Sequence, residues 1–507
     1  MLEQKMQFRF ALPAGALALL AFIAGCHVGP AYNPPAPPAI TALNFKESTV
    51  NFQDPAGWKV ASPSDAMLRG NWWEVFNEPE LNALEDQLNI NNQNIKQYFQ
   101  NYMEARATIS QARAQYWPTI STAPSVEGTR SSGNQVISSA ASTGKTTSLW
   151  EIPLDLSWTP DLWGKIRNEV NEAKYVSQVS AADLQLEKLT EQASLAQYFF
   201  EIRGQDKLQQ ILNETIKSDQ EALDAAQGSY DVGVGDFISV VEAKATVDSV
   251  RATAINVALL RAQYEHAIAM LIGKIPTDFS ISVKPMIYNA PAIPTGVPSQ
   301  LLERRPDVAA AERTLAEENA VVGIGYAAYY PNVTITASGG TESALLSHLF
   351  DLASGFWTVG GNATETIFNH GLYTAQIHQY EATYNADLAA YRQSVLNAFQ
   401  QVEDALAGTR IYSQQILQQQ DAVAASQQYL DLEQERFKAG VDPFVDVTLA
   451  QNTLLTNQET LNAIQIDEMT SAVQLVQALG GGWSKADLPT PDQVGAKTTN
   501  ADYALQK

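Results

Sequence analysis

The chain repeats its own pattern at one long offset. An offset of 207 positions places one set of glycines and their neighbours on a second set with the same spacing. The matched pairs are Gly164 with Gly371, Gly233 with Gly440, Phe237 with Phe444, Ala243 with Ala450 and Gly273 with Gly480. An offset of 213 matches Tyr116-Trp117-Pro118 to Tyr329-Tyr330-Pro331. A period of this length indicates a duplicated half rather than a solenoid repeat of about 20–50 residues.

Each half predicts one very long helix followed by a shorter one. No proline occurs between Gly164 and Pro276, and the glycines near Gly233 mark a tight reversal. We therefore expect helices over 164–230 and 237–273, with equivalents over 371–437 and 444–480. A helix of about 67 residues spans about 100 Å. A further helix over 80–117, ended by Pro118, would complete the same height when placed end to end with the shorter helix.

Apolar spacing in both long helices favours packed coiled-coil faces. The residues step by three and four positions, as in Leu186, Leu189, Ala193, Ala196 and Phe200, and in Leu388, Tyr391, Val395, Ala398 and Val402. This periodicity alone is also compatible with a plain coiled-coil rod.

Alternating strands argue against a rod. Apolar residues from Trp150 to Trp158 alternate with Glu151, Pro153, Asp155 and Ser157, as in a transmembrane β-strand with aromatic residues at both ends. We expect four strands, at about 118–130, 148–160, 331–340 and 356–368. A soluble hairpin packed on the helices is the alternative for each strand alone. Four strands cannot close a membrane barrel, which needs at least eight, so the barrel must be shared between subunits. Two subunits would give eight strands and three would give twelve.

The first residues indicate export and lipid attachment. Lys5 and Arg9 precede an apolar run of about 14 residues, which is too short to span a membrane and predicts a signal peptide over 1–25. Small residues directly before Cys26, the only cysteine in the chain, predict lipidation at Cys26. An ordinary signal peptide with an incidental cysteine is the alternative. His27 rather than Asp follows Cys26, which favours the outer membrane, and the proline-rich stretch 26–70 predicts an extended, lipid-anchored segment.

Charge and motifs exclude several classes of function. The formal net charge of −23 argues against nucleic acid as a partner. The sequence contains no G-x-S-x-G, P-loop or HExxH motif, and His370 and His378 lie too far apart for a usual helical metal pair. We therefore expect no enzyme activity, no metal site and no cofactor.

Three further segments resemble one protein family. They are Trp72-Trp73 with Phe76 and Asn77–Leu81, the linker Pro294–Val308, and Ala478–Trp483. Together with Cys26–Tyr32 they resemble the TolC-like outer membrane factors, and within them the lipoprotein (NodT/OprM-type) branch of RND multidrug efflux systems. The resemblance covers about 26–484. It implies a first repeat over 71–275, an inter-repeat linker over 276–303, a second repeat over 304–483, and a polar tail over 484–507 that we expect to be disordered.

The resemblance also implies an assembly and a role. It implies a homotrimer whose 12-stranded outer-membrane β-barrel, with four strands per chain, continues into a long periplasmic α-helical barrel. Such a protein is the exit duct of a tripartite pump, lies in the outer membrane of a Gram-negative bacterium and extends into the periplasm. Its partners are a periplasmic membrane-fusion adaptor, an inner-membrane RND-type transporter and outer-membrane lipid. The alternatives are the outer-membrane channel of a type I protein-secretion system and a non-conducting coiled-coil lipoprotein.

The two helix reversals are the candidate functional site. They lie farthest from the strands, so they would form a periplasmic tip, where a trimer brings acids toward one axis. The candidate gate residues are Val445, Leu449, Glu242, Asp446, Asp236 and Asp442. The turns expected to contact the adaptor contain Gly233, Val234, Gly235, Gly440 and Val441. Family members carry a gate acid in a segment Val-Leu-Asp-Ala-Gln, but Leu449 replaces that acid here, so Val445 and Leu449 would form an apolar constriction.

Overall fold

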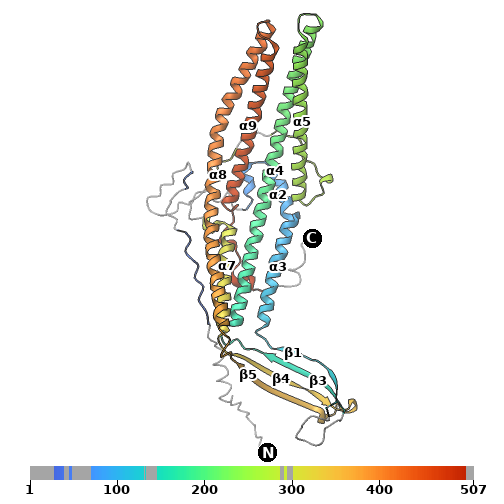
Figure 1. Cartoon of the computed structure of the whole chain (residues 1–507), viewed down its shortest axis with the longest axis vertical. Helices are drawn as coiled ribbons and strands as arrows, with labels where there is room; N and C mark the ends of the chain where they lie inside the picture. The colour runs from blue at the N-terminus through green and yellow to red at the C-terminus, as the bar shows by residue number, and fades with distance from the viewer. Residues whose placement is uncertain are drawn as a thin grey trace, which may run out of the picture.

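The fold was analysed in a computed structural model of the chain. It describes residues 28–38, 45–47, 70–130, 132, 146–285, 290–293 and 301–497, with the backbone alone at 301 and 302. Long helices form an elongated body, a twisted sheet lies at one end, and the two helix reversals lie at the other end (Figure 1). The predicted signal peptide and Cys26 lie outside the described residues.

The four long helices repeat with one offset. Two of them, α4 (Lys165–Asp231) and α8 (Leu372–Lys438), have 67 residues each. The two shorter ones, α5 (Phe237–Leu271) and α9 (Phe444–Ala478), have 35 each. The first and last residues of α8 and α9 therefore lie 207 positions after those of α4 and α5. This confirms the four helices expected from the glycine spacing.

The incoming helix of the first half is broken, which corrects the expected continuous helix over 80–117. The chain forms α2 (Pro79–Asn91) and α3 (Gln93–Ala114), separated by Asn92. The Asn92 side chain accepts a hydrogen bond from the backbone N–H of Ile95 (2.9 Å) and donates to the carbonyl of Leu271 (2.9 Å). Because Asn92 is buried, these bonds satisfy its amide and make the break a defined junction.

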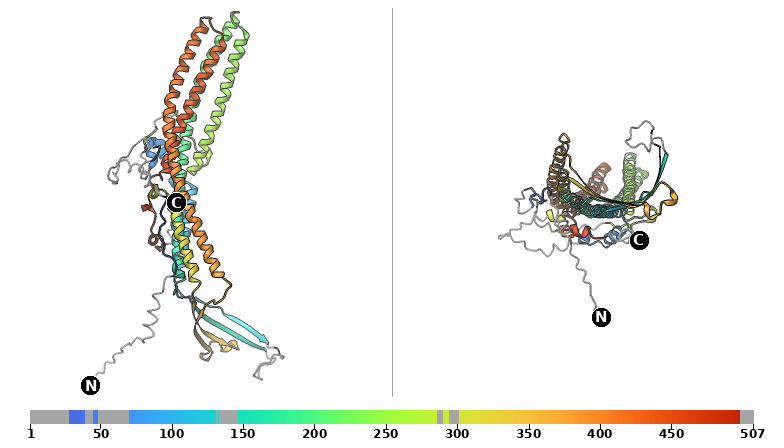
Figure 2. Two further views of the ribbon diagram at one scale, coloured as in Figure 1. Left: turned by 60° about the vertical axis from the view of Figure 1, so that its left-hand side comes forward. Right: turned by 90° about the horizontal axis from the view of Figure 1, so that it is seen from below.

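The helices form one curved layer. Near the sheet, neighbours in the layer follow the order α3, α4, α7 (Pro306–Ala327) and α8, and toward the reversals α5 and α9 take the places of α3 and α7 (Figures 1 and 2). As expected, α7 begins at Pro306 with Asp307 in its first turn. The layer thus has two free edges, one formed by α3 and α5 and the other by α8. Within the described residues, no helix has the length and apolar character needed to cross a membrane.

The sheet is antiparallel and open. Its strands, β1 (Thr119–Ser121), β2 (Ser125–Arg130), β3 (Thr146–Trp158), β4 (Asn332–Ser343) and β5 (Gly355–Thr364), differ by a few residues from the expected bounds. Both β1 and β2 pair with β3, which pairs with β4, which pairs with β5.

The first expected strand is interrupted, which corrects the single strand over 118–130. The interruption contains Pro124 and lies opposite Pro153 of β3. Proline has no backbone N–H, so neither residue can donate to the ladder there. The Thr122 hydroxyl instead donates to the carbonyl of Pro153 (2.6 Å).

Strand register repeats with the sequence. In the second half Asn332 of β4 faces Thr364 of β5, and in the first half Thr119 of β1 faces Ser157 of β3. The offset of 213 relates the first residues of these pairs, and the offset of 207 relates the second. The two halves therefore share one pattern of strand pairing.

The main core lies midway along the helices. Trp72 and Trp73, in the 3₁₀ helix Trp72–Phe76, are 1% and 2% exposed, and Phe199 and Phe200 of α4 pack in the same apolar cluster. Burial of these large aromatic side chains stabilises this part of the molecule. The other short elements are η3 (Pro276–Asp278), α6 (Leu301–Arg304), η5 (Leu346–His348), η6 (Leu352–Ser354), η7 (Lys485–Asp487) and α10 (Pro491–Val494).

The segment after the second repeat is ordered as far as residue 497, so the expectation of a disordered tail is wrong for 484–497. Val494 of α10 is 1% exposed and packs against Ile109 of α3 and Ala173 of α4. The guanidinium groups of Arg106 and Arg113 donate to backbone carbonyls of this segment. Residues 498–507 lie outside the described part of the chain.

Candidate functional site at the helix reversals

Both helix reversals depend on a glycine with left-handed backbone geometry. Gly233 has φ of 76° and Gly440 has φ of 73°, which other residues adopt only with strain. The amides that follow bond back into the preceding helix: Val234 donates to Ser229 (3.0 Å) and Val441 donates to Arg436 (3.0 Å). Each long helix therefore ends in a fixed cap, and the next helix begins within a few residues.

The turns at the two reversals expose apolar side chains, which is why we expect them to contact another molecule. Val232, Val234 and Val441 are 75%, 85% and 63% exposed. Gly233, Gly235 and Gly440 are exposed beside them. Apolar side chains that gather at the tip of a long arm are typical of a docking surface.

Asp236 has a structural role that the sequence analysis did not assign. It is the N-cap of α5, where its carboxylate accepts a hydrogen bond from the backbone N–H of Ser239 (2.8 Å). This hydrogen bond lowers the pKa of Asp236 and keeps it ionised. In the second half the equivalent position is Pro443, so only the first hairpin carries this acid.

Asp442 is paired within its own chain. Both oxygens of its carboxylate accept hydrogen bonds from the Arg436 guanidinium, which lowers the pKa of Asp442. Its carboxylate, with those of Glu433 and Asp446, forms a group whose ligand atoms lie within 4.8 Å of one another. Partial desolvation and the two neighbouring acids raise the pKa of Glu433. Arg436 supplies one positive charge to this cluster of three carboxyl groups, through its pair with Asp442.

Glu433 was missed by the sequence analysis. It lies in α8 rather than in the turn, and only the reversal at Gly440 brings it beside Asp442 and Asp446. Glu433 is separated from both acids along the sequence, so no local motif indicates that the three carboxyl groups lie together.

The predicted apolar pair faces away from its own hairpin. Val445 and Leu449 of α9, one helical turn apart, are 48% and 57% exposed. In the same helix Phe444, Val447 and Ala450 are buried against the hairpin. Val445 and Leu449 therefore form an exposed apolar surface on the side of α9 away from its own hairpin. Glu242, which is equivalent to Leu449 in the first half, is half-buried on α5.

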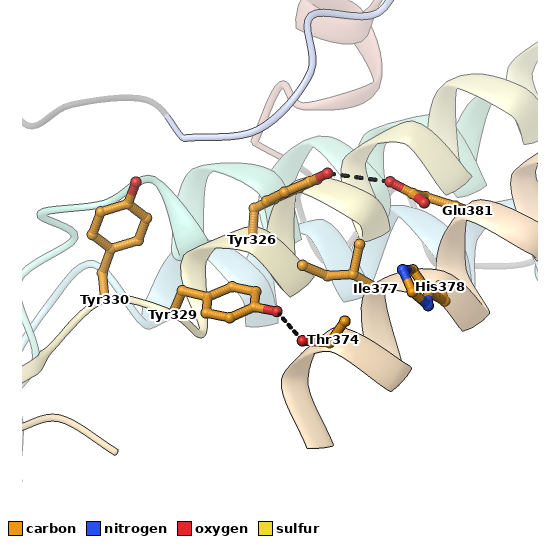
Figure 3. A pocket seen from close by; sticks show the side chains of 7 residues that line it. All are labelled: Tyr326, Tyr329, Tyr330, Thr374, Ile377, His378 and Glu381. Atoms are coloured by element: carbon orange, nitrogen blue, oxygen red, sulfur yellow. Dashed lines mark hydrogen bonds between the residues drawn. The ribbon is translucent and has the colours of Figure 1, made fainter. Parts of the chain in front are cut away.

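A second polar feature joins α7 to α8 near the sheet (Figure 3). The Tyr326 hydroxyl donates to Glu381 (3.1 Å), and the hydroxyls of Tyr329 and Thr374 lie 2.9 Å apart. A cavity of about 400 Å³ lies between these contacts, with Ile377 and His378 in its lining. The cross-links hold the end of α7 against α8 where the chain enters β4.

Comparison with known proteins places the chain in a family. The family model described as "Outer membrane efflux protein" matches residues 84–274 and 297–481. These two matched stretches follow the two halves of the duplication.

Related proteins from Pseudomonas putida match almost the whole chain. The antibiotic efflux pump outer membrane protein ArpC is 29% identical over 491 residues, which cover 95% of this chain and 98% of ArpC. The solvent efflux pump outer membrane protein SrpC is 30% identical over 483 residues, which cover 94% of this chain and 99% of SrpC.

Solved structures share the fold. The outer-membrane channel OprN is 25% identical with a TM-score of 0.80, over 90% of this chain and all of that chain. The open state of the MtrE outer membrane channel of Neisseria gonorrhoeae is 24% identical with a TM-score of 0.76, over 91% of this chain and 99% of that chain.

Proposed function

Since this chain belongs to the outer membrane efflux protein family, we propose that three copies form the passive exit duct of a tripartite efflux pump. The duct lies in the outer membrane of a Gram-negative bacterium and extends into the periplasm. It conducts small toxic compounds from the periplasmic assembly to the outside.

The observation that carries this proposal is the pair of unpaired sheet edges. Among the described residues, β5 has a pairing partner on one side only, and β1 and β2 pair only with β3. Open edges are not tolerated in lipid, so a membrane sheet must close on itself or on copies of itself.

The duplication supplies the geometry of closure. Inside one chain, β3 of the first half pairs with β4 of the second half, with Glu151 opposite Glu342. At the offset of 207, β3 is equivalent to β5, and at the offset of 213, β4 is equivalent to β1 and β2. The equivalent pairing between two subunits therefore places β5 of one beside β1 and β2 of the next. The same register then places Thr358 of one subunit opposite Thr129 of the next. With β1 and β2 counted as one interrupted strand, each chain contributes four strands, and three chains give the twelve strands proposed for the barrel.

The helical layer supports the same closure. The free edge formed by α3 and α5 exposes Ile255 (74%) and Leu259 (55%), and the free edge at α8 exposes Leu396 (51%) and Leu417 (61%). Packing α8 of one subunit against α3 and α5 of the next would bury these apolar side chains. It also repeats between subunits the packing of α4 on α7 and α9 inside one chain.

The partners follow from the two ends of the molecule. We propose that a periplasmic membrane-fusion adaptor docks on the exposed valines of the two turns and couples the duct to an inner-membrane RND-type transporter. Lipidation of Cys26 and outer-membrane lipid around the barrel hold the other end. Relatives are named for antibiotic efflux, toluene efflux and pyoverdine export. The cargo class proposed here is therefore small organic compounds, selected by the transporter. The duct itself performs no catalysis.

Deletion of the gene tests the function. We expect lower resistance to antibiotics or solvents, unchanged secretion of proteins, and recovery of resistance when the chain is supplied in trans. Loss of protein secretion with normal resistance would indicate a type I secretion channel. No change in either, together with no conductance in planar bilayers, would indicate a non-conducting lipoprotein.

A further inference from the structure

The two helical hairpins, α4–α5 and α8–α9, differ in their interior at three equivalent positions. In the second hairpin, Ser426 of α8 is 6% exposed and accepts a hydrogen bond from the Asn457 amide of α9 (2.6 Å). Gln419 of α8 in turn donates to the Asn457 side chain (3.1 Å). The Ser426 hydroxyl donates to the carbonyl of Ala422 (2.8 Å). This polar group is therefore internally satisfied.

The first hairpin replaces that polar group with a carboxyl among apolar side chains. The offset of 207 takes Gln419, Ser426 and Asn457 to Leu212, Asp219 and Val250. Asp219 is 2% exposed, and neither of its side-chain oxygens has a hydrogen-bond partner in the described structure. A buried carboxylate without partners is strongly unfavourable, so the neutral carboxylic acid is the form that fits this packing.

Among the described residues, no charged side chain compensates Asp219. On α4 itself Lys217 and Glu221 are exposed. On α5, Arg251 donates to Gln220 (3.0 Å) and lies 3.6 Å from Asp248. Between Val447 and Ile466 of α9, the ionisable side chain is Glu459, which is an acid.

Burial alone raises the pKa of Asp219 to about 6. A folded pKa above the unfolded value means that the packed state is fully favoured below about pH 4 and loses stability as pH rises to about 6. The carboxyl therefore changes charge near pH 6.

Asp219 also lies where the two hairpins meet. One apolar cluster nearer the tip contains Ala243 of the first hairpin with Leu430 and Phe444 of the second. A second cluster contains Leu212 and Val250, with Leu455 of α9 packed against it. On α4, Asp219 lies between Ile216, which packs against the second cluster, and Ala222, which packs against the first.

We propose that Asp219 is a proton-sensitive element of the first hairpin. Protonated, it permits α4 to pack on α5 and α9. Ionised, it draws water into this contact and loosens the first hairpin, while the second hairpin does not respond. As a regulation of the tip, this inference rests on the proposed function as a duct.

Hydrogen exchange of the full-length protein in detergent tests the proposal. The wild type and Asp219→Asn are compared at the same pH, from pH 5 to pH 7.5, so that the intrinsic exchange rate cancels. We expect opening of residues 215–223 and 246–254, relative to Asp219→Asn, to increase about tenfold over this range, as the shifted pKa requires. Residues 422–430 and 453–461 of the second hairpin should show no such change.

A second variant transfers the satisfied polar pair. Asp219→Ser with Val250→Asn should remove the pH dependence as Asp219→Asn does, and it keeps the test available if the single variant fails to fold. The same ratio at every pH, or an equal response of both hairpins, would overturn the proposal. Native mass measured on the same sample tests the trimer separately, because the exchange comparison can be read within each chain.

Discussion

Gly29 and Gly323 lie backbone to backbone. A Cβ on Gly29 would be 2.7 Å from the Cα of Gly323, so the N-terminal segment rests directly on α7. The adjacent Val28 N–H donates to the carbonyl of Trp163 (3.2 Å), between the sheet and the helices. These contacts thus fix residues 28 and 29 at the junction between the sheet and the helices.

Gly29→Val should displace the N-terminal segment without removing the lipid. Valine adds bulk where there is no room, and Gly29 has φ of 117°, which a β-branched residue adopts only with strain. We expect faster hydrogen exchange in residues 28–33, with palmitate labelling of Cys26 retained. Ala36→Val, at an exposed position of the same segment, is the control. Equal protection in the two variants would contradict the role assigned to the contact.

Arg305→Ala should destabilise the junction between the repeats. Arg305 is 7% exposed, donates to the carbonyl of Ala478 at the end of α9 (3.0 Å), and pairs with Asp307. Loss of these charged hydrogen bonds leaves a buried acceptor unpaired and should lower the free energy of unfolding by about 2 kcal/mol. Denaturant unfolding measures this. Arg392→Ala, an exposed position on α8, should change it by less than about 0.5 kcal/mol.

Glu317→Gln should alter the pH dependence of stability. Burial first, then the charges of Glu318, Glu172 and Asp387, raise the pKa of Glu317 to about 7. Its folded pKa lies above the unfolded value of 4.5, so wild-type stability is full below about pH 4.5 and falls as pH rises through 7. The variant should lose that part of the decline, about 2 kcal/mol at pH 8 after allowance for solvent screening of this partly exposed carboxyl. Thermal unfolding from pH 4.5 to pH 8 measures it, and parallel curves would show that the carboxyl is not buried as described.

Substitutions at the two helix reversals should change the conductance and ion selectivity of the channel. Val445→Ala with Leu449→Ala removes exposed apolar bulk from the proposed constriction and should raise single-channel conductance. Glu242→Gln with Asp446→Asn should weaken cation selectivity, because both carboxylates would face the axis. Asp442→Asn is the informative comparison, since Arg436 already balances that acid and the effect should be smaller. A double alanine variant that conducts no better than wild type would place the constriction elsewhere.

Local signals in the sequence were enough for the long helices. Their ends lie at Gly164, Gly233 and their equivalents, where backbone geometry demands glycine, and the duplication supplied an independent check on each bound. The break at Asn92 gave no such signal, because its cause is a hydrogen bond to Leu271, far along the chain. Order in 484–497 likewise depends on α3, through the distant Arg106 and Arg113.

The candidate site was predicted in position more than in detail. The turns lie where the glycines indicated, and the apolar pair Val445 and Leu449 is exposed. The roles of Asp236 as a cap and Asp442 as a partner of Arg436 depend on side-chain geometry within the turn. Composition and spacing do not encode such geometry.

Cysteine cross-linking across the proposed subunit boundary tests the central claim most directly. Thr358→Cys with Thr129→Cys places two thiols opposite each other only if β5 of one subunit pairs with β2 of the next in the register derived from the duplication. Thr358→Cys with Glu127→Cys shifts one thiol by two residues on the same face and is the matched control. Oxidation followed by non-reducing electrophoresis should give covalent trimers for the first pair and far fewer for the second. Monomers from both pairs, or efficient cross-linking by the shifted pair alone, would contradict the shared barrel in this register.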